Sequence, residues 1–224
     1  MCNLYSVTSN QEAIRDWAGV MAENDSTGNM EPMPAVFPDY AAPIVRNQGA
    51  VRELALVRWG MPTPPKYLEG KRTDPGVTNI RNVNSAHWRR WLGVENRCVV
   101  PFTSFSENEV MPDGSRPPIW FALNETRPLA FFAGICTPKW TSVRKLKEGE
   151  VTVDLFGFLT TAPNKLVGTY HPKAMPVILT TREEIELWMT APIKDALKLQ
   201  RPLPEDALVV VARGSKKDPE TLAA

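Results

Sequence analysis

The spacing of apolar and polar positions along the chain predicts mostly short strands. Residues 51–60, "VRELALVRWG", alternate between apolar and polar side chains, which predicts a strand that ends at Trp59. Further strands are predicted by short apolar runs that turn-forming residues separate, namely "RCVVPFTSFSE", "PIWFAL", "LAFFAGI", "VTVDLFGFLTT" and "ALVVVAR".

Helical spacing is less frequent. Helices are predicted after the capping-box pattern Ser9–Glu12, over residues 84–92, after Thr181 and over residues 193–199. Residues 23–50 contain four prolines and little periodicity, so we expect a long ordered loop there.

Many short strands with few short helices predict an α+β fold of curved, mostly antiparallel β-sheets, barrel-like, with flanking helices. No repeat or linker divides the sequence, so we expect a single domain over residues 1–224, with a frayed tail at 214–224. The 43% hydrophobic content is enough for one sizeable core. The 21 prolines, well above the usual share of about 5%, indicate long and stiff loops.

Composition excludes several classes of protein. With 26 Lys and Arg against 25 Asp and Glu, the net charge of +1 is not typical of a nucleic-acid protein, so any polyanion site must be a local patch. Three cysteines without a Cys-x-x-Cys pair argue against a disulfide framework and a zinc site. Because we see no membrane span, secretory signal, phosphate loop or dinucleotide motif, we expect a cytoplasmic protein without metal or cofactor.

The chain begins "MCNLY", so that removal of Met1 would make Cys2 the N-terminal residue. An N-terminal cysteine carries a thiol and an α-amine on adjacent carbons, and this pair can condense with an aldehyde to form a thiazolidine ring. A free α-amine titrates near pH 8 and a thiol near pH 8.5, so both groups are usable near neutral pH. A cysteine at this position can also be there by chance.

Two histidines and one carboxylate are further candidates. His171, in "TYHPKAMPVIL", lies in a loop ahead of an apolar run, and histidine transfers protons near pH 7. His87, in "NSAHWRRW", is expected to pack against the helix or to lie at the surface. Glu107 ends an apolar strand, either facing solvent or partly buried with a raised pKa, and the sequence leaves both open.

Three more candidate residues each have a structural and a functional interpretation. Asn79 and Arg81, in "TNIRN", either form a turn with a solvated arginine or supply a substrate-orienting amide and a phosphate-binding guanidinium. Trp59, which follows Arg58, is either a core residue or a platform for a nucleic-acid base.

In this order, the segments "MCNLY", "RWGM", "NIRNV", "RCVVPFTSFSE", "TTAPN" and "HPKAMPVIL" resemble the SRAP family (SOS response-associated peptidase). Members of this family shield abasic sites in single-stranded DNA, and the resemblance runs from Cys2 to about Leu179. It implies that self-processing removes Met1 and that Cys2 then crosslinks to the aldehyde of the ring-opened abasic sugar. By motif, the resemblance also implies an active-centre role for Asn79, Glu107 and His171.

The sequence departs from the family pattern in three places. Asn3 and Leu4 stand where the family often has Gly-Arg, "SFSEN" replaces Gly-Phe-Tyr-Glu-Trp, and "HPKAMP" is one residue longer than the commoner His-x-Arg-Met-Pro. Lys173 within that last segment can still supply a cation. The departures affect the expected strength and geometry of DNA binding more than the chemistry.

These residues suggest a mechanism. Glu107 and His171 would move protons while the Cys2 amine forms a Schiff base and its thiol closes the thiazolidine. Arg58, Arg81 and Lys173 would neutralise phosphates of single-stranded DNA, and the Schiff base would permit weak lyase activity. We expect a monomer that is nucleoid-associated when bound to DNA.

Two other functions remain open at the level of sequence. One is an N-terminal-cysteine hydrolase that acts on a peptide or an amide. The other is a non-enzymatic binder of single-stranded DNA that uses Trp59 and a basic groove.

Overall fold

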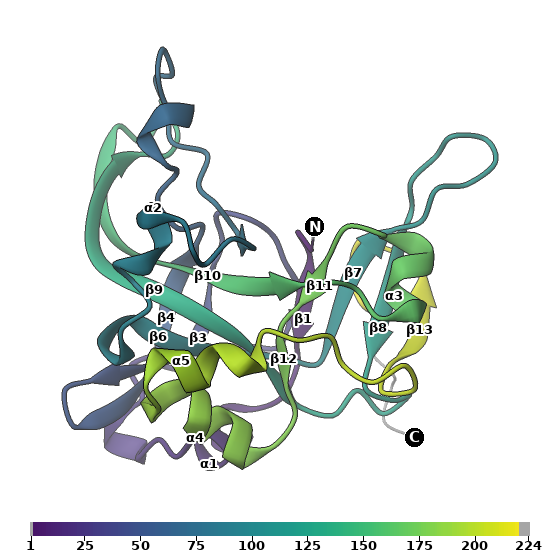
Figure 1. The fold of residues 1–224 in the computed structure, drawn as a ribbon, viewed down its shortest axis with the longest axis horizontal. Helices are drawn as coiled ribbons and strands as arrows, with labels where there is room; N and C mark the ends of the chain where they lie inside the picture. The colour runs from purple at the N-terminus through teal and green to yellow at the C-terminus, as the bar shows by residue number, and fades with distance from the viewer. Residues whose placement is uncertain (1, 220–224) are drawn as a thin grey trace.

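A closed barrel forms the centre of the computed structural model, which describes residues 2–219 (Figure 1). Five strands of this part of the chain pair in a ring in the order β10-β4-β3-β6-β9-β10, and only the β4–β10 contact in the ring is parallel. The ring consists of β3 (Ala41–Gln48), β4 (Val51–Trp59), β6 (Arg97–Phe102), β9 (Ala130–Val143) and β10 (Glu150–Thr161). Three two-residue strands extend it: β5 (Asn79–Ile80), β11 (Met175–Pro176) and β12 (Ile178–Leu179).

A second, antiparallel sheet lies beside the barrel, with β7, β8 and β13 at the right in Figure 1. Its strand order is β13-β8-β7-β1-β2. The strands are β1 (Tyr5–Val7), β2 (Met33–Val36), β7 (Ser104–Asn108), β8 (Pro118–Ala122) and β13 (Val209–Arg213). The expected α+β fold of curved, mostly antiparallel sheets is therefore confirmed.

Short helices cover the sheets. The α-helices of the described residues are α1 (Gln11–Ala18), α2 (Ala86–Arg89), α3 (Lys165–Tyr170), α4 (Arg182–Thr190) and α5 (Ile193–Ala196). Single 3₁₀ turns are η1 (Ala22–Asn24), η2 (Pro65–Tyr67), η3 (Val94–Asn96) and η4 (Leu197–Leu199). Thr181 caps α4 as predicted, whereas α1 is capped by Asn10 and not by Ser9. The Asn10 side chain accepts a hydrogen bond from the Ala13 N–H, which satisfies a free donor of the first turn.

Tyr5 connects the two sheets. From β1 its ring makes edge contacts with Trp59, Phe132 and Phe158 of the barrel, at centroid distances of 5.1, 5.7 and 6.2 Å. All four rings are fully buried, and each such pair contributes about 0.5–1.5 kcal/mol beyond the area that it buries. Since β1 begins three residues after Cys2, this packing also fixes the start of the chain against the barrel.

The prediction of a loop over residues 23–50 is wrong. This segment contains the end of η1, all of β2 and all of β3, which pairs with β4 along its full length. Pro43 lies within β3, but β6 pairs with β3 only at Val45 and Arg46, so the proline stands beyond that ladder. Proline is tolerated in a strand at such a position, because no partner strand requires its missing N–H.

Two other elements differ from expectation. The run "RCVVPFTSFSE" forms two strands, because the chain leaves the barrel at Thr103 and enters the second sheet as β7. The tail is held as far as Asp218, whose carboxylate pairs with Arg127 at 2.8 Å and accepts a hydrogen bond from Ser104. Asp218 is 4% exposed, so fraying does not begin at residue 214. Residues 220–224 of the expected tail lie outside the described part of the chain.

Candidate active site at the N-terminus

Cys2 lies at the entrance to β1, between the barrel and the second sheet. Its thiol contacts the carbonyl oxygen of Leu4 at 3.5 Å, and the same carbonyl accepts a hydrogen bond from the Ser106 N–H at 2.9 Å. The pairing of β1 with β7 therefore places Cys2 beside Glu107, the next residue of β7. Both residues are buried, with 1% and 5% exposure respectively.

Asn79 holds the backbone of Cys2. It lies in β5, which runs parallel to β10 with Asn79 opposite Phe158. Its Nδ2 donates to the Cys2 carbonyl at 2.8 Å and also contacts Thr78 Oγ1 at 2.8 Å. The buried Oδ1 of Asn79 has no hydrogen-bond partner within residues 2–219. The amide thus positions Cys2 with its nitrogen and keeps an acceptor for a further group.

His171 joins the cluster from the end of α3. It follows α3, and its backbone N–H donates to the Val167 carbonyl at 2.7 Å, which ends the helix. Its Nδ1 lies 3.6 Å from Glu107 Oε2. Helix α3 in turn starts at Asn164, which caps it by accepting from the Val167 N–H. The segments "TTAPN" and "HPKAMP" therefore bring the histidine to the carboxylate of β7.

Burial controls the charges in this cluster. It raises the pKa of the Cys2 thiol far above its ordinary value, and the negative charge of Glu107 raises it further. Burial also raises the pKa of Glu107 to about 7. Burial and the positive charge of Lys173 lower the pKa of His171, so the imidazole is neutral at pH 7. A carboxyl that titrates near neutrality can both give and take a proton, whereas the thiol needs such a base before it can react.

The predicted DNA-binding residues lie in different environments. Arg81 and Lys173 are exposed, and no acidic side chain within residues 2–219 forms an ion pair with either. Arg58 is held by Asp39 at 2.6 Å and by Glu148 at 3.0 Å. Trp59 is fully buried and its indole N–H donates to the Thr78 carbonyl, so no ring face is open to a base. Of the two interpretations of Trp59, the structure agrees with the core residue.

Sequence reasoning missed two neighbours of the cluster. Thr78 Oγ1 contacts both Asn79 Nδ2 and, at 3.1 Å, Asn3 Oδ1. From the sequence, Asn3 was singled out only because it stands where the family often has glycine. In the structure its side chain belongs to this polar group. The adjacency of Thr78 to Asn79 was a visible signal, because a hydroxyl beside an amide can accept its N–H and orient it.

The described part of the chain has neither a membrane-spanning helix nor a metal-binding cluster. None of its helices is long and apolar enough to cross a membrane. Within residues 2–219, no group of three or more His, Cys, Asp or Glu side chains is arranged to hold a metal ion. The three cysteines are all buried and free of disulfides.

Solved structures share this barrel and second sheet. A protein from Bordetella bronchiseptica superposes with a TM-score of 0.68 at 24% identity, covering 93% of this chain and 98% of the other. A protein from Bacteroides thetaiotaomicron gives a TM-score of 0.68 at 19% identity, covering 93% and 90%. At these identities the likeness shows the fold alone.

The family follows from the sequence comparison. The model of the family "SOS response associated peptidase (SRAP)" matches residues 1–214, so the chain belongs to the SRAP family. A relative from Bacillus subtilis, named abasic site processing protein YoqW, is 29% identical over 184 residues, covering 80% of this chain and 77% of the relative. Abasic site processing protein YoaM of the same organism is 27% identical over 165 residues, covering 72% and 67%.

Proposed function

We propose that this protein processes abasic sites in single-stranded DNA and forms a covalent thiazolidine crosslink through Cys2. The observation that carries the proposal is the cluster at the N-terminus, in which one amide, one carboxyl and one imidazole surround a cysteine that becomes terminal on loss of Met1. The names of the relatives YoqW and YoaM support the substrate class.

The first step exposes the amine. In the chain that begins with Met1, the Cys2 nitrogen is a peptide amide and cannot attack a carbonyl. Hydrolysis of the Met1–Cys2 bond consumes one water and releases methionine, and the adjacent Glu107 and His171 supply the proton transfers for this self-processing.

The crosslink then forms in two condensing steps. The Cys2 amine adds to C1′ of the open-chain abasic sugar and loses one water, which gives a Schiff base. Glu107, with its pKa of about 7, accepts the thiol proton, and the sulfur adds to the same carbon while the imine nitrogen takes up a proton. The net change is one water lost for each thiazolidine formed. The free Oδ1 of Asn79 accepts a hydrogen bond from the amine or the sugar and keeps it in register.

Exposed cations next to the cluster bind the strand. Arg81 lies two residues after Asn79, and Lys173 two residues after His171, so both flank the reacting sugar. Each phosphate that they neutralise makes the affinity fall with salt. Arg58 binds a phosphate of the DNA strand only if its ion pairs with Asp39 and Glu148 break. The Schiff-base stage also permits β-elimination at the sugar, so we expect weak cleavage of the DNA strand. We expect the protein to act as a monomer.

A denaturing gel tests the proposal. Purified protein is incubated with a single-stranded oligonucleotide that carries one abasic site, and with the intact oligonucleotide as control. We expect a heat-stable shifted band that requires both the abasic site and Cys2. Absence of the band from a preparation whose intact mass shows that Met1 has been removed refutes the crosslink and favours an N-terminal-cysteine hydrolase.

Two variants separate the roles of the amine and the thiol. Cys2→Ser keeps the terminal amine without the thiol, so its adduct should survive heating only after borohydride reduction of the Schiff base. Cys136→Ala removes a buried cysteine of the barrel and should crosslink like the parent protein. A stable unreduced band from Cys2→Ser would contradict thiazolidine formation.

A further inference from the structure

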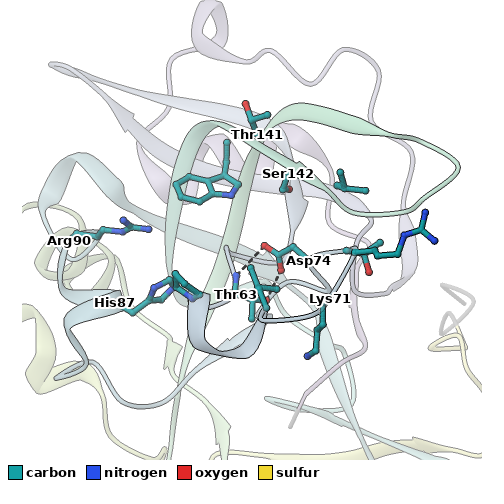
Figure 2. Close-up of a pocket in the computed structure, with 13 residues that line it drawn as sticks. Thr63, Lys71, Asp74, His87, Arg90, Thr141 and Ser142 are labelled. Carbon is teal, nitrogen blue, oxygen red and sulfur yellow. Dashed lines mark hydrogen bonds between the residues drawn. The ribbon is translucent and has the colours of Figure 1, made fainter.

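A pocket of about 390 Å³ lies apart from the N-terminal cluster (Figure 2). Its walls come from residues 63–74, helix α2 and the β9–β10 hairpin, and none of the four candidate active-site residues lines it. Figure 2 shows Lys71, His87 and Arg90 arranged around Thr63 and Asp74.

The pocket favours an anion. Lys71, Arg72 and Arg90 line it and are exposed. Asp74 is the acidic residue of the lining, and its carboxylate is already engaged by the Thr63 hydroxyl at 2.5 Å and the Gly76 N–H at 2.8 Å. The lining thus carries three positive charges and one negative charge, and the negative carboxylate already accepts hydrogen bonds from the protein. The net charge gives the pocket a positive potential.

The pocket also contains planar groups in fixed positions. The Arg90 guanidinium lies 3.9 Å from the ring centroid of Trp91 and 5.4 Å from that of Trp140, a half-buried residue of the lining. These ring contacts orient Arg90 without neutralising its charge. His87 Nε2 lies 2.9 Å from the Pro62 carbonyl, and because a carbonyl only accepts, Nε2 carries a proton.

A second pocket adjoins this one, since Pro65 and His87 line both. His87 also lines a neighbouring pocket of about 470 Å³, together with Lys66, Tyr67 and Asn82. Asn82 directly follows Arg81 in the chain. Lys66 and Tyr67 of the second pocket thus add a cation and a planar ring beside the first pocket.

We propose that the 390 Å³ pocket binds one nucleoside phosphate unit of the single strand, outside the abasic site. The base packs against Trp140 and Arg90, and the phosphate contacts Lys71 and Arg72. This inference rests on the proposed function, because the strand that reacts at Cys2 supplies the nucleotide.

The test measures binding of an intact single-stranded oligonucleotide by fluorescence anisotropy. Trp140→Ala and Arg90→Ala should each weaken binding about tenfold, the effect typical of losing one base stack. Arg89→Ala is the matched control, because Arg89, the last residue of α2, is the exposed neighbour of Arg90 and is absent from the lining of this pocket. Thermal unfolding of each variant confirms that it is folded, and Trp140→Phe, which keeps a planar ring, should recover part of the loss.

The phosphate contact has its own readout. Lys71→Ala should reduce the salt dependence of binding by about 0.7 in the slope of log K against log salt, the value for one phosphate of a single strand. Lys147→Ala, an exposed lysine of the β9–β10 turn outside the lining, should leave the slope unchanged.

Three outcomes decide the matter. Equal affinity of the parent, Trp140→Ala and Arg90→Ala proteins would overturn the proposal. Binding of free thymidine monophosphate as tight as that of the oligonucleotide would overturn its assignment to a strand. If the variants bind weakly but no protein crosslinks to abasic DNA, the covalent function fails while the pocket assignment stands. At saturating DNA we expect the variants to reach the crosslink yield of the parent.

Discussion

Glu107→Gln should make the protein more stable relative to the parent as the pH rises. Burial raises the pKa of Glu107 from its ordinary 4.5 to about 7, so the folded chain holds this proton where the unfolded chain has lost it. An acid with a raised pKa stabilises the folded state fully below the unfolded value, and the contribution is lost as the pH rises through the folded value. Glutamine keeps the shape of the protonated acid and does not titrate.

The size of the effect follows from the two pKa values. Between pH 5 and pH 8 the contribution of Glu107 falls by about 2.5 kcal/mol, since each tenfold difference in proton affinity corresponds to about 1.4 kcal/mol. Because Glu107 is 5% exposed, solvent screening reduces this figure little. The stability difference between Glu107→Gln and the parent should therefore shift by about 2.5 kcal/mol in favour of the variant.

Urea unfolding of both proteins at pH 5 and pH 8 measures this shift, and comparing the two proteins cancels all other titrating groups to first order. Glu125→Gln, at an exposed carboxyl, is the control and should give a difference near zero. A shift below about 0.5 kcal/mol for Glu107→Gln would mean that the carboxyl ionises as in water. The assignment of Glu107 as a proton carrier near pH 7 would then be refuted.

Two further changes test the positioning of the site and of the barrel. Asn79→Ala removes the donor to the Cys2 carbonyl. It should slow crosslinking about 10- to 100-fold in single-turnover gels, with little change in the oligonucleotide affinity measured by anisotropy. An unchanged rate would contradict a positioning role. Gly76→Ala should lower the free energy of unfolding, measured by urea titration, by about 3 kcal/mol. The reason is that φ is +74° and the new Cβ would lie 2.1 Å from Nη2 of the buried Arg144. Gly28→Ala has φ of +69° with no atom within 4 Å and should cost only about 1 kcal/mol; equal losses for the two would show that Arg144 moves aside.

The sequence pattern was enough to predict an element where a single strand or helix follows one periodicity. Strand β4 was predicted to its last residue because residues 51–59 alternate, and α4 was predicted from its Thr181 cap and its apolar face. Strand β3 was missed because proline lowers every local strand signal, and pairing with β4 overrides it. The break at Thr103 was invisible because the residues on both sides are buried, in the barrel before it and in the second sheet after it.

The residues of the candidate site could be named from the sequence, but their arrangement could not. The order of motifs singled out Cys2, Asn79, Glu107 and His171, and the structure brings all four together. No local pattern shows that β1 pairs with β7, which is what places Cys2 beside Glu107, since this contact joins residues about a hundred positions apart. The burial that shifts the pKa values depends on the same long-range pairing.

The architecture explains how a terminal residue can be held as firmly as an internal one. A chain end normally frays, because its backbone has few partners. Here Tyr5 packs into the barrel, Leu4 pairs with Ser106, and Asn79 binds the Cys2 carbonyl, so that consecutive residues are fixed up to the nitrogen that would react. The proposed crosslink, which uses both an amine and a thiol on neighbouring carbons, needs this confinement, because two bonds would form at one sugar carbon in a defined orientation.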